Sequence, residues 1–88
     1  MIDDTVYTLD NGIDMQYIDG GVMYMLNGFA LEITGEGDHG EIATENGCIG
    51  YYTRDEDGVV RAEIDDGRKL RIGESEEEFA EFAKQMLS

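Results

Sequence analysis

The sequence predicts an α+β domain: an antiparallel β-meander of about seven strands, as a curved sheet or a partly rolled barrel, followed by one C-terminal amphipathic helix. Two observations lead to this prediction. Glycine-containing turn signals recur about every eight to ten residues, between stretches that alternate or are β-rich. A helix-capping sequence then precedes apolar residues at helical spacing. We therefore expect residues 1–88 to form a single domain, with the meander over residues 1–73 and the helix over residues 75–87.

The first two strands are predicted to meet across a three-residue loop at residues 10–12, which ends in glycine. This loop sets Leu9 opposite Ile13 and Tyr7 opposite Met15, so apolar side chains meet across the pair. A first strand thereby joins the sheet.

Two tight turns are predicted at Asp19-Gly20 and Asn27-Gly28, because such dipeptides accept the positive φ of two-residue hairpins. Both hairpins place their apolar residues on one face of a three-stranded unit, and a slip of one residue in either hairpin would destroy that agreement. The expected pairs are Tyr17 with Val22, Met15 with Tyr24, Ile13 with Leu26, Leu26 with Phe29, Tyr24 with Leu31, and Val22 with Ile33.

The glycine-rich stretch 35–40 is expected to be the turn that leads to the second group of strands. There we predict a turn at Asn46-Gly47, a four-residue loop at residues 55–58 and a three-residue loop at residues 65–67. These choices keep apolar residues opposite one another. The expected pairs are Thr44 with Ile49, Ile42 with Tyr51, Tyr51 with Ala62, Thr53 with Val60, Ala62 with Leu70, Val60 with Ile72, and Glu63 with Lys69.

The final segment is predicted to be a helix that starts at a capping box formed by Ser75 and Glu78. Glu76 and Glu77 suit the positive end of the helix dipole. An apolar stripe follows, and we expect it to cover the open face of the curved sheet. The stripe consists of Phe79, Phe82, Ala83, Met86 and Leu87.

Acidic and basic residues are segregated along the chain. The first 53 residues contain ten carboxylates and no lysine or arginine, and all six basic residues lie from Arg54 onward. The formal net charge is −15. Such a surface repels nucleic acid and anionic membranes, and it attracts cationic sites such as the nucleic-acid-binding groove of another protein.

Cysteine usage and the chain's hydropathy indicate the compartment. Cys48 is the only cysteine, which excludes an internal disulfide and a cysteine-rich metal site and favours a cytosolic setting. Residues 1–4 contain no basic leader, and no apolar run approaches the length of a membrane span. We expect a soluble cytoplasmic protein that does not bind membranes.

The motifs of conventional sites are incomplete. The loop at residues 55–58 is similar to the start of a calcium loop, but Thr53 and Ile64 then stand where the first ligand and the bidentate glutamate should be. His39 has no second histidine or cysteine nearby to complete a metal or nucleophile site. Paired acids at turns and at the helix start are expected to be exposed to solvent, whereas catalysis needs a cleft that is partly shielded from water. We therefore expect no enzymatic activity, no metal and no cofactor.

The acidic side chains remain as the candidate site. On a sheet, residues of one face lie roughly 6.6 Å apart along a strand and roughly 4.8 Å apart between strands, so carboxylates can form a lattice that imitates phosphates. Such a lattice fits a groove lined with lysine and arginine. The candidate partner-binding residues are Asp14, Asp19, Glu32, Glu36, Asp38, Glu41, Glu45, Tyr52, Asp55, Glu56 and Asp57.

In size, acidity and lack of catalytic motifs, the chain resembles the small phage-encoded inhibitors that imitate DNA, including many anti-CRISPR proteins. The resemblance lies in composition and charge pattern and in no motif. It implies a non-enzymatic inhibitor that binds a basic nucleic-acid-handling protein or complex and blocks its access to DNA. In a phage-encoded protein, the site of action would be the host cell cytoplasm.

Two other functions are compatible with the sequence. An adaptor or assembly subunit, which could form a homodimer, would use the reverse side of the central sheet, where apolar and polar residues interleave. If the sheet rolls into a closed or two-layered barrel, as the small number of apolar residues favours, those apolar residues are core instead. The apolar residues of the reverse side are Ile18, Met23, Met25 and Ala30. As a further alternative, the acidity adapts a small domain to a high-salt cytoplasm.

Tyr52 is expected on the outer face opposite Arg61. It is either a contact anchor or, more commonly in such positions, a cross-strand packing residue.

Overall fold

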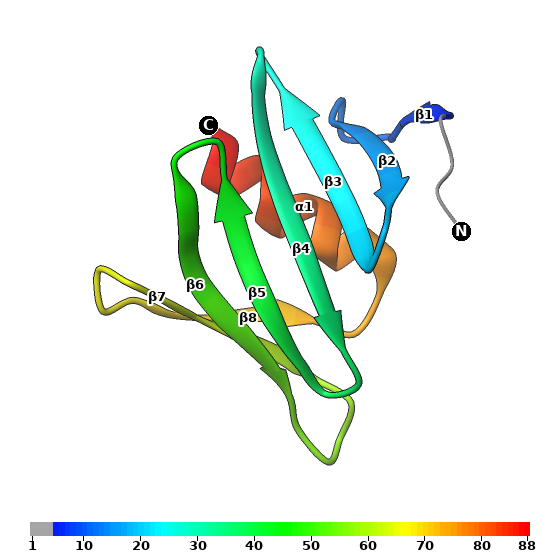
Figure 1. Ribbon diagram of the computed structural model, residues 1–88. Helices are drawn as coiled ribbons and strands as arrows, with labels where there is room; N and C mark the ends of the chain where they lie inside the picture. The colour runs from blue at the N-terminus through cyan, green and yellow to red at the C-terminus, as the bar shows by residue number, and fades with distance from the viewer. Residues whose placement is uncertain (1–4) are drawn as a thin grey trace.

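The structure is a computed structural model that describes residues 5–88 (Figure 1). Within this range, an antiparallel sheet of eight strands in sequence order is followed by one helix, so the α+β meander is confirmed. The elements are β1 (Val6–Thr8), β2 (Asp14–Ile18), β3 (Gly21–Leu26), β4 (Phe29–Glu36), β5 (His39–Thr44), β6 (Gly47–Arg54), β7 (Val60–Ile64), β8 (Lys69–Gly73) and α1 (Glu76–Leu87). Residues 1–4, with Asp3 and Asp4 of the base-free stretch, lie outside the described residues.

The predicted registers of the first three hairpins are confirmed. Tyr7 lies opposite Met15, Met15 opposite Tyr24, and Tyr24 opposite Leu31, which forms one continuous row across β1 to β4. At the β3–β4 turn, Asn27 and Gly28 both have positive φ, 54° and 83°. Those dihedral signs belong to a type I′ turn, whose twist matches that of the flanking strands.

The strand count of about seven is wrong, because each predicted hairpin forms and even the three-residue β1 pairs with β2. The turn within residues 35–40 is also shorter than expected. Strands β4 and β5 extend through most of this stretch, with Gly35 opposite Gly40 and Glu36 opposite His39, so only residues 37–38 connect them.

The predicted pairing of β5 with β6 is wrong, because the observed pairing has a different register. The turn lies at residues 45–46, so Thr44 pairs with Gly47 rather than with Ile49. Ala43 then pairs with Cys48, but Ile42 pairs with Gly50, which makes Ile49 the extra residue of a β-bulge. Beyond this bulge, every later residue of β6 lies on the opposite face from the predicted one.

The bulge explains the remaining corrections. Tyr52, not Tyr51, lies opposite Ala62, and the β6–β7 loop has five residues, 55–59, because Arg54 pairs with Val60. The last hairpin keeps its predicted pairs, Ala62 with Leu70 and Glu63 with Lys69. A second irregularity then shifts Val60 onto Gly73 instead of Ile72.

Tyr52 fills a space that two glycines leave open. A Cβ atom on Gly40 would overlap the Tyr52 ring, and a Cβ atom on Gly35 would overlap its hydroxyl group. The paired glycines thus let the ring lie against the backbone of β4 and β5 where the sheet bends. Gly35 and Gly40, in the stretch expected to be only a turn, therefore have a packing role.

Helix α1 covers one face of the curved sheet, here called the concave face (Figure 1). It contacts β3, β4 and β8 and buries Ala80, Phe82 and Ala83, while Phe79, Met86 and Leu87 pack at the margin. The predicted apolar stripe is therefore confirmed as the cover of the sheet. The sheet does not close into a barrel, since β1 and β8 are its two edges. Because one helix covers the concave face, the other face, here called the convex face, is not a second core layer.

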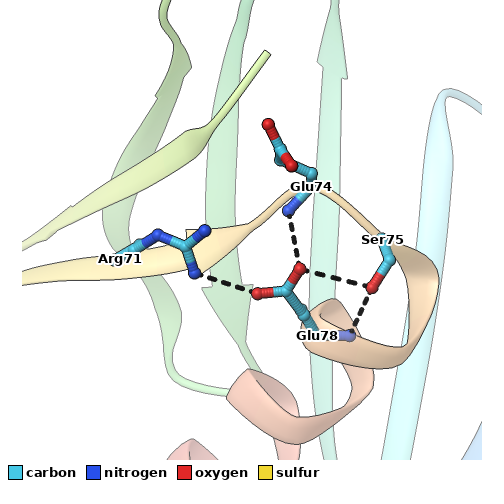
Figure 2. A network of polar contacts seen from close by, with 4 residues as sticks. All are labelled: Arg71, Glu74, Ser75 and Glu78. Carbon is cyan, nitrogen blue, oxygen red and sulfur yellow. Dashed lines mark hydrogen bonds and ion pairs between the residues drawn. The ribbon is translucent and has the colours of Figure 1, made fainter. Parts of the chain in front are cut away.

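The helix begins as predicted at a cap (Figure 2). The backbone N–H of Glu78 donates to Ser75 Oγ at 3.2 Å, and the Glu78 carboxylate accepts the N–H of Glu74 at 3.2 Å. Arg71 on β8 donates to the same carboxylate at 2.9 Å. These bonds hold the pKa of Glu78 below its usual value, with the Glu74 N–H as the largest cause and Arg71 next. Glu78 therefore joins β8 to α1.

Candidate functional site

Four of the predicted acids project from the convex face. Asp14 on β2, Glu32 and Glu36 on β4, and Glu41 on β5 alternate with inward-facing residues such as Ile33. Glu32, Glu36 and Glu41 are exposed, whereas Asp14 is half-buried. The antiparallel registers thus gather carboxylates from three strands on one side of the molecule.

A second group of acids lies along one end of the sheet, where the β2–β3, β4–β5 and β6–β7 connections gather. Backbone bonds hold these connections together: Gly35 N–H donates to Gly20 O at 3.1 Å, and Arg54 N–H donates to Asp38 O at 2.7 Å. The last two connections lie next to each other at the bottom of Figure 1. We call this end the acidic edge; it carries Asp19, Glu36, Asp38, Asp55, Glu56 and Asp57.

Three predicted acids have contacts that serve the fold. Glu45 lies at the opposite end of the sheet and accepts the backbone N–H of Ala30 at 2.9 Å. Asp55 accepts the N–H groups of residues 57 and 59 at 3.0 and 3.1 Å, which orders the β6–β7 loop. Asp14 accepts the Thr8 hydroxyl at 3.0 Å. These carboxylates are therefore less available to a partner.

The prediction that Tyr52 lies on the outer face opposite Arg61 is wrong: Thr53 lies opposite Arg61, and Tyr52 is half-buried on the concave face. The exposed tyrosine of β6 is Tyr51, which is 56% exposed on the convex face beside Glu41. The Cys48 thiol next to Tyr51, and then the Glu41 carboxylate, raise the pKa of the Tyr51 hydroxyl. Sequence reasoning missed Tyr51 because alternation alone does not reveal a bulge.

Neutralisation of the acids differs between the two halves of the chain. Within residues 5–88, the ion pairs are Arg61 with Asp55, Arg68 with Asp66, and Arg71 with Glu78. None of them involves an acid that precedes Arg54. The carboxylates of Asp19, Glu32, Glu36, Asp38 and Glu41 therefore form no ion pair within the described chain.

Two basic residues, Arg61 and Lys69, project from the convex face of the last hairpin. Arg61 lies opposite Arg71, whose side chain is bound to Glu78 of α1, and Lys69 lies opposite Glu63. The segregation of charge along the sequence is thus partly a segregation in space: the convex face of β2 to β5 carries the acids, and the convex face of the last hairpin carries Arg61 and Lys69.

The mixed apolar residues of the central strands also lie on the convex face. The closed-barrel prediction, which made them core, is wrong because the helix lies on the other side. They remain half-buried by their neighbours in the sheet and are open to a partner. They are Ile18, Met23, Met25 and Ala30.

Comparisons and site searches add no assignment. In the described part of the chain, no group of three or more histidine, cysteine, aspartate or glutamate residues is arranged to hold a metal ion. None of the helical structure in residues 5–88 has the length and hydropathy needed to cross a bilayer. No protein-family model, curated protein or solved structure matches the chain.

Proposed function

We propose that this protein is a non-enzymatic inhibitor that occupies a basic nucleic-acid-binding site on a partner protein, in the manner of DNA mimics of the anti-CRISPR kind. The convex face and the acidic edge present the carboxylates, and the partner supplies lysine and arginine. The partner is a protein or complex that handles nucleic acid in the cytoplasm, of a host cell if the protein is phage-encoded.

One observation carries this proposal. Five carboxylates, on the convex face and along the acidic edge, form no ion pair within residues 5–88, although the same chain pairs acids with arginines elsewhere. Concentrated charge of one sign raises the local concentration of an opposite charge and speeds its association. It also destabilises the fold by repulsion, which a function in binding would explain. These carboxylates belong to Asp19, Glu32, Glu36, Asp38 and Glu41.

An adaptor function is the alternative that a specific observation favours. Met23 and Met25 lie on the uncovered convex face, and Tyr51 is exposed on the same side. Methionine and tyrosine are common in interface centres. In this alternative the apolar residues supply most of the affinity, and a second copy of the chain is one possible partner.

Salt-dependent capture distinguishes the two functions. The immobilised protein is incubated with nuclease-treated bacterial lysate, and bound proteins are challenged with duplex DNA and with salt. We expect nucleic-acid-handling proteins to be captured, to be displaced by the DNA, and to be released steeply between about 50 and 200 mM salt. Recovery of no such protein, or binding that is indifferent to salt, would contradict the proposal.

Charge-reversal variants locate the contact. A triple variant with Glu36→Lys, Asp38→Lys and Glu41→Lys should lose most of its affinity for a captured partner and remain folded. The matched control is Asp10→Lys, Asp65→Lys and Glu74→Lys, which changes the net charge equally at exposed positions elsewhere. Equal losses in both variants would show that only total charge matters. Salt-resistant capture that Met23→Gln and Met25→Gln abolish would instead support the adaptor.

A further inference from the structure

Strand β8 is an edge of the sheet with unpaired backbone groups. Across the β7–β8 turn, Ile64 N–H donates to Arg68 O at 2.9 Å, and Gly67 N–H donates to Ile64 O at 2.9 Å. Bonded pairs recur at every second position of an antiparallel ladder, so Leu70 is the next residue bonded to β7. The N–H and C=O groups of Lys69 and Arg71 therefore point away from β7, toward the open edge.

A groove runs between this edge and helix α1. Its volume is about 350 Å³, and it has an apolar floor and acidic walls. Ile72 and Phe82 form the floor, both buried. Glu77 and Glu81 stand one helical turn apart on the wall, exposed and without an ion pair to residues 5–88. Arg71, on the opposite wall, is already bound to Glu78 (Figure 2).

We propose that this groove binds an extended peptide segment of a partner, which adds to β8 as a ninth strand and carries lysine or arginine at alternate positions. Backbone bonds to Lys69 and Arg71 supply affinity, as in other cases of strand addition beside a helix. Side chains on the concave side of the added strand enter the groove. There, the aliphatic stems of basic residues lie on Ile72 and Phe82, and their charged ends reach Glu77 and Glu81.

The charge on the other side of the added strand fixes its phase. Lys69 projects from the convex face of β8, whereas the Arg71 side chain is bound to Glu78 of α1, so the peptide residue beside Lys69 on the convex side must be neutral or acidic. A segment with uninterrupted lysines would place a cation against Lys69. The groove therefore selects alternation as well as positive charge.

A second copy of the chain does not fit the groove. Antiparallel pairing of two β8 strands keeps both convex faces on one side, which brings the Lys69 side chains of the two copies onto the same face. The formal net charge of −15 on each copy adds repulsion. Charged side chains on an edge strand are a common protection against such self-pairing.

This inference goes beyond the proposed inhibition of a nucleic-acid-binding site and does not depend on it. The residues of the groove belong to β8 and α1, whereas the proposed mimic surface lies on β2 to β5 and the acidic edge. The probe below also contains no nucleic-acid-binding protein, so the two proposals can fail separately.

Synthetic peptides test the groove. The probe is an end-blocked heptapeptide that alternates threonine with lysine, and the control has the same composition with its three lysines contiguous. We expect the alternating peptide to bind more tightly. At a concentration ten times its Kd, amide hydrogen exchange of Lys69 and Arg71 should slow about tenfold, since only the unoccupied fraction exchanges. Equal binding of the two peptides, no binding, or unchanged exchange at these amides would overturn the proposal.

Two pairs of variants separate the contribution of backbone hydrogen bonds to peptide binding from the contribution of the acidic side chains. Arg71→Pro removes an outward N–H and should weaken binding more than Arg71→Ala, which removes only the side chain. Glu77→Gln with Glu81→Gln should weaken binding about threefold to tenfold. The matched control, Glu74→Gln with Glu76→Gln, changes exposed acids that do not line the groove. If Arg71→Pro fails to fold, the glutamate pairs decide: equal losses in both would overturn the proposal.

Discussion

The two faces of the sheet have the same strands but different contacts. On the concave face, Leu31 and Ile42 are fully buried in the core, and Tyr24 is 2% exposed. Burial is the largest cause that raises the pKa of the Tyr24 hydroxyl to about 12. On the convex face, the side chains of Glu32 and Glu41 face solvent and have no ion pair within residues 5–88.

This difference shows how a chain of 88 residues keeps a fold despite a formal charge of −15. The apolar residues of alternate positions lie on one face, and a single helix covers them. The other face is then not required for the core and can carry charge. The acids that form ion pairs, such as Glu78 and Asp66, are paired with arginines in the C-terminal part of the chain.

Truncation of one large side chain on each face gives the largest expected contrast. Leu31→Ala creates a cavity under the helix and should cost about 2–5 kcal/mol of unfolding free energy. Met23→Ala on the convex face should cost less than about 1 kcal/mol, because its site remains open to solvent. Urea unfolding measures both. A Met23→Ala variant as unstable as Leu31→Ala would show that the convex face is covered in solution.

Much of the fold follows from turn chemistry and alternation. Asn27 and Gly28 specify a type I′ turn, and Tyr24 is correctly placed opposite both Met15 and Leu31 because a slip would turn the apolar set outward. Ser75 and Glu78 specify the helix start. In each case a local signal and the burial pattern agree, which is why these elements could be predicted.

The rest could not be predicted because it depends on contacts between distant residues. Ile49 becomes the extra residue of a bulge, and nothing in the alternation of residues 47–54 marks it. The bulge exchanges the faces of Tyr51 and Tyr52, and with them the candidate aromatic contact. Whether the sheet closes depends likewise on the helix. Glu45, by contrast, lies at the opposite end of the sheet because consecutive turns of a meander alternate between the two ends, which the predicted topology already implies.

Neutralising three acids that have no ion pair, and separately three acids that are in ion pairs, should give an intermediate difference in unfolding temperature. In dilute buffer, the variant with Glu32→Gln, Glu36→Gln and Glu41→Gln should unfold at a higher temperature than the natural chain, because it loses repulsion without losing a partner. The variant with Asp55→Asn, Asp66→Asn and Glu78→Gln should unfold at a lower temperature, because it loses the three ion pairs.

Repeating the thermal unfolding in salt tests whether the difference between the two variants is electrostatic. In about 1 M salt the Debye length falls to about 3 Å, so the stabilisation by the first variant should largely disappear. The natural chain should fold in dilute buffer and gain stability with salt. A chain that folds only in molar salt would instead support adaptation to a high-salt cytoplasm.

The smallest expected effect is the pH dependence contributed by Glu78, at the junction of β8 and α1. Its pKa is lowered in the folded state, first by the Glu74 N–H and then by Arg71. A lowered pKa means that the ionised group stabilises the fold at pH values above its ordinary 4.5, and that this stabilisation is lost as the pH falls through the folded value. Glu78→Gln should therefore lower the Tm near neutral pH, and the deficit should shrink as the pH falls below 4.5. Glu77→Gln, in the same helical turn but without these bonds, should lower the Tm less. A deficit that persists unchanged in acid would show that Glu78 acts through packing and not through its charge. A deficit that both variants share equally would show that Glu78 acts only through the helix dipole.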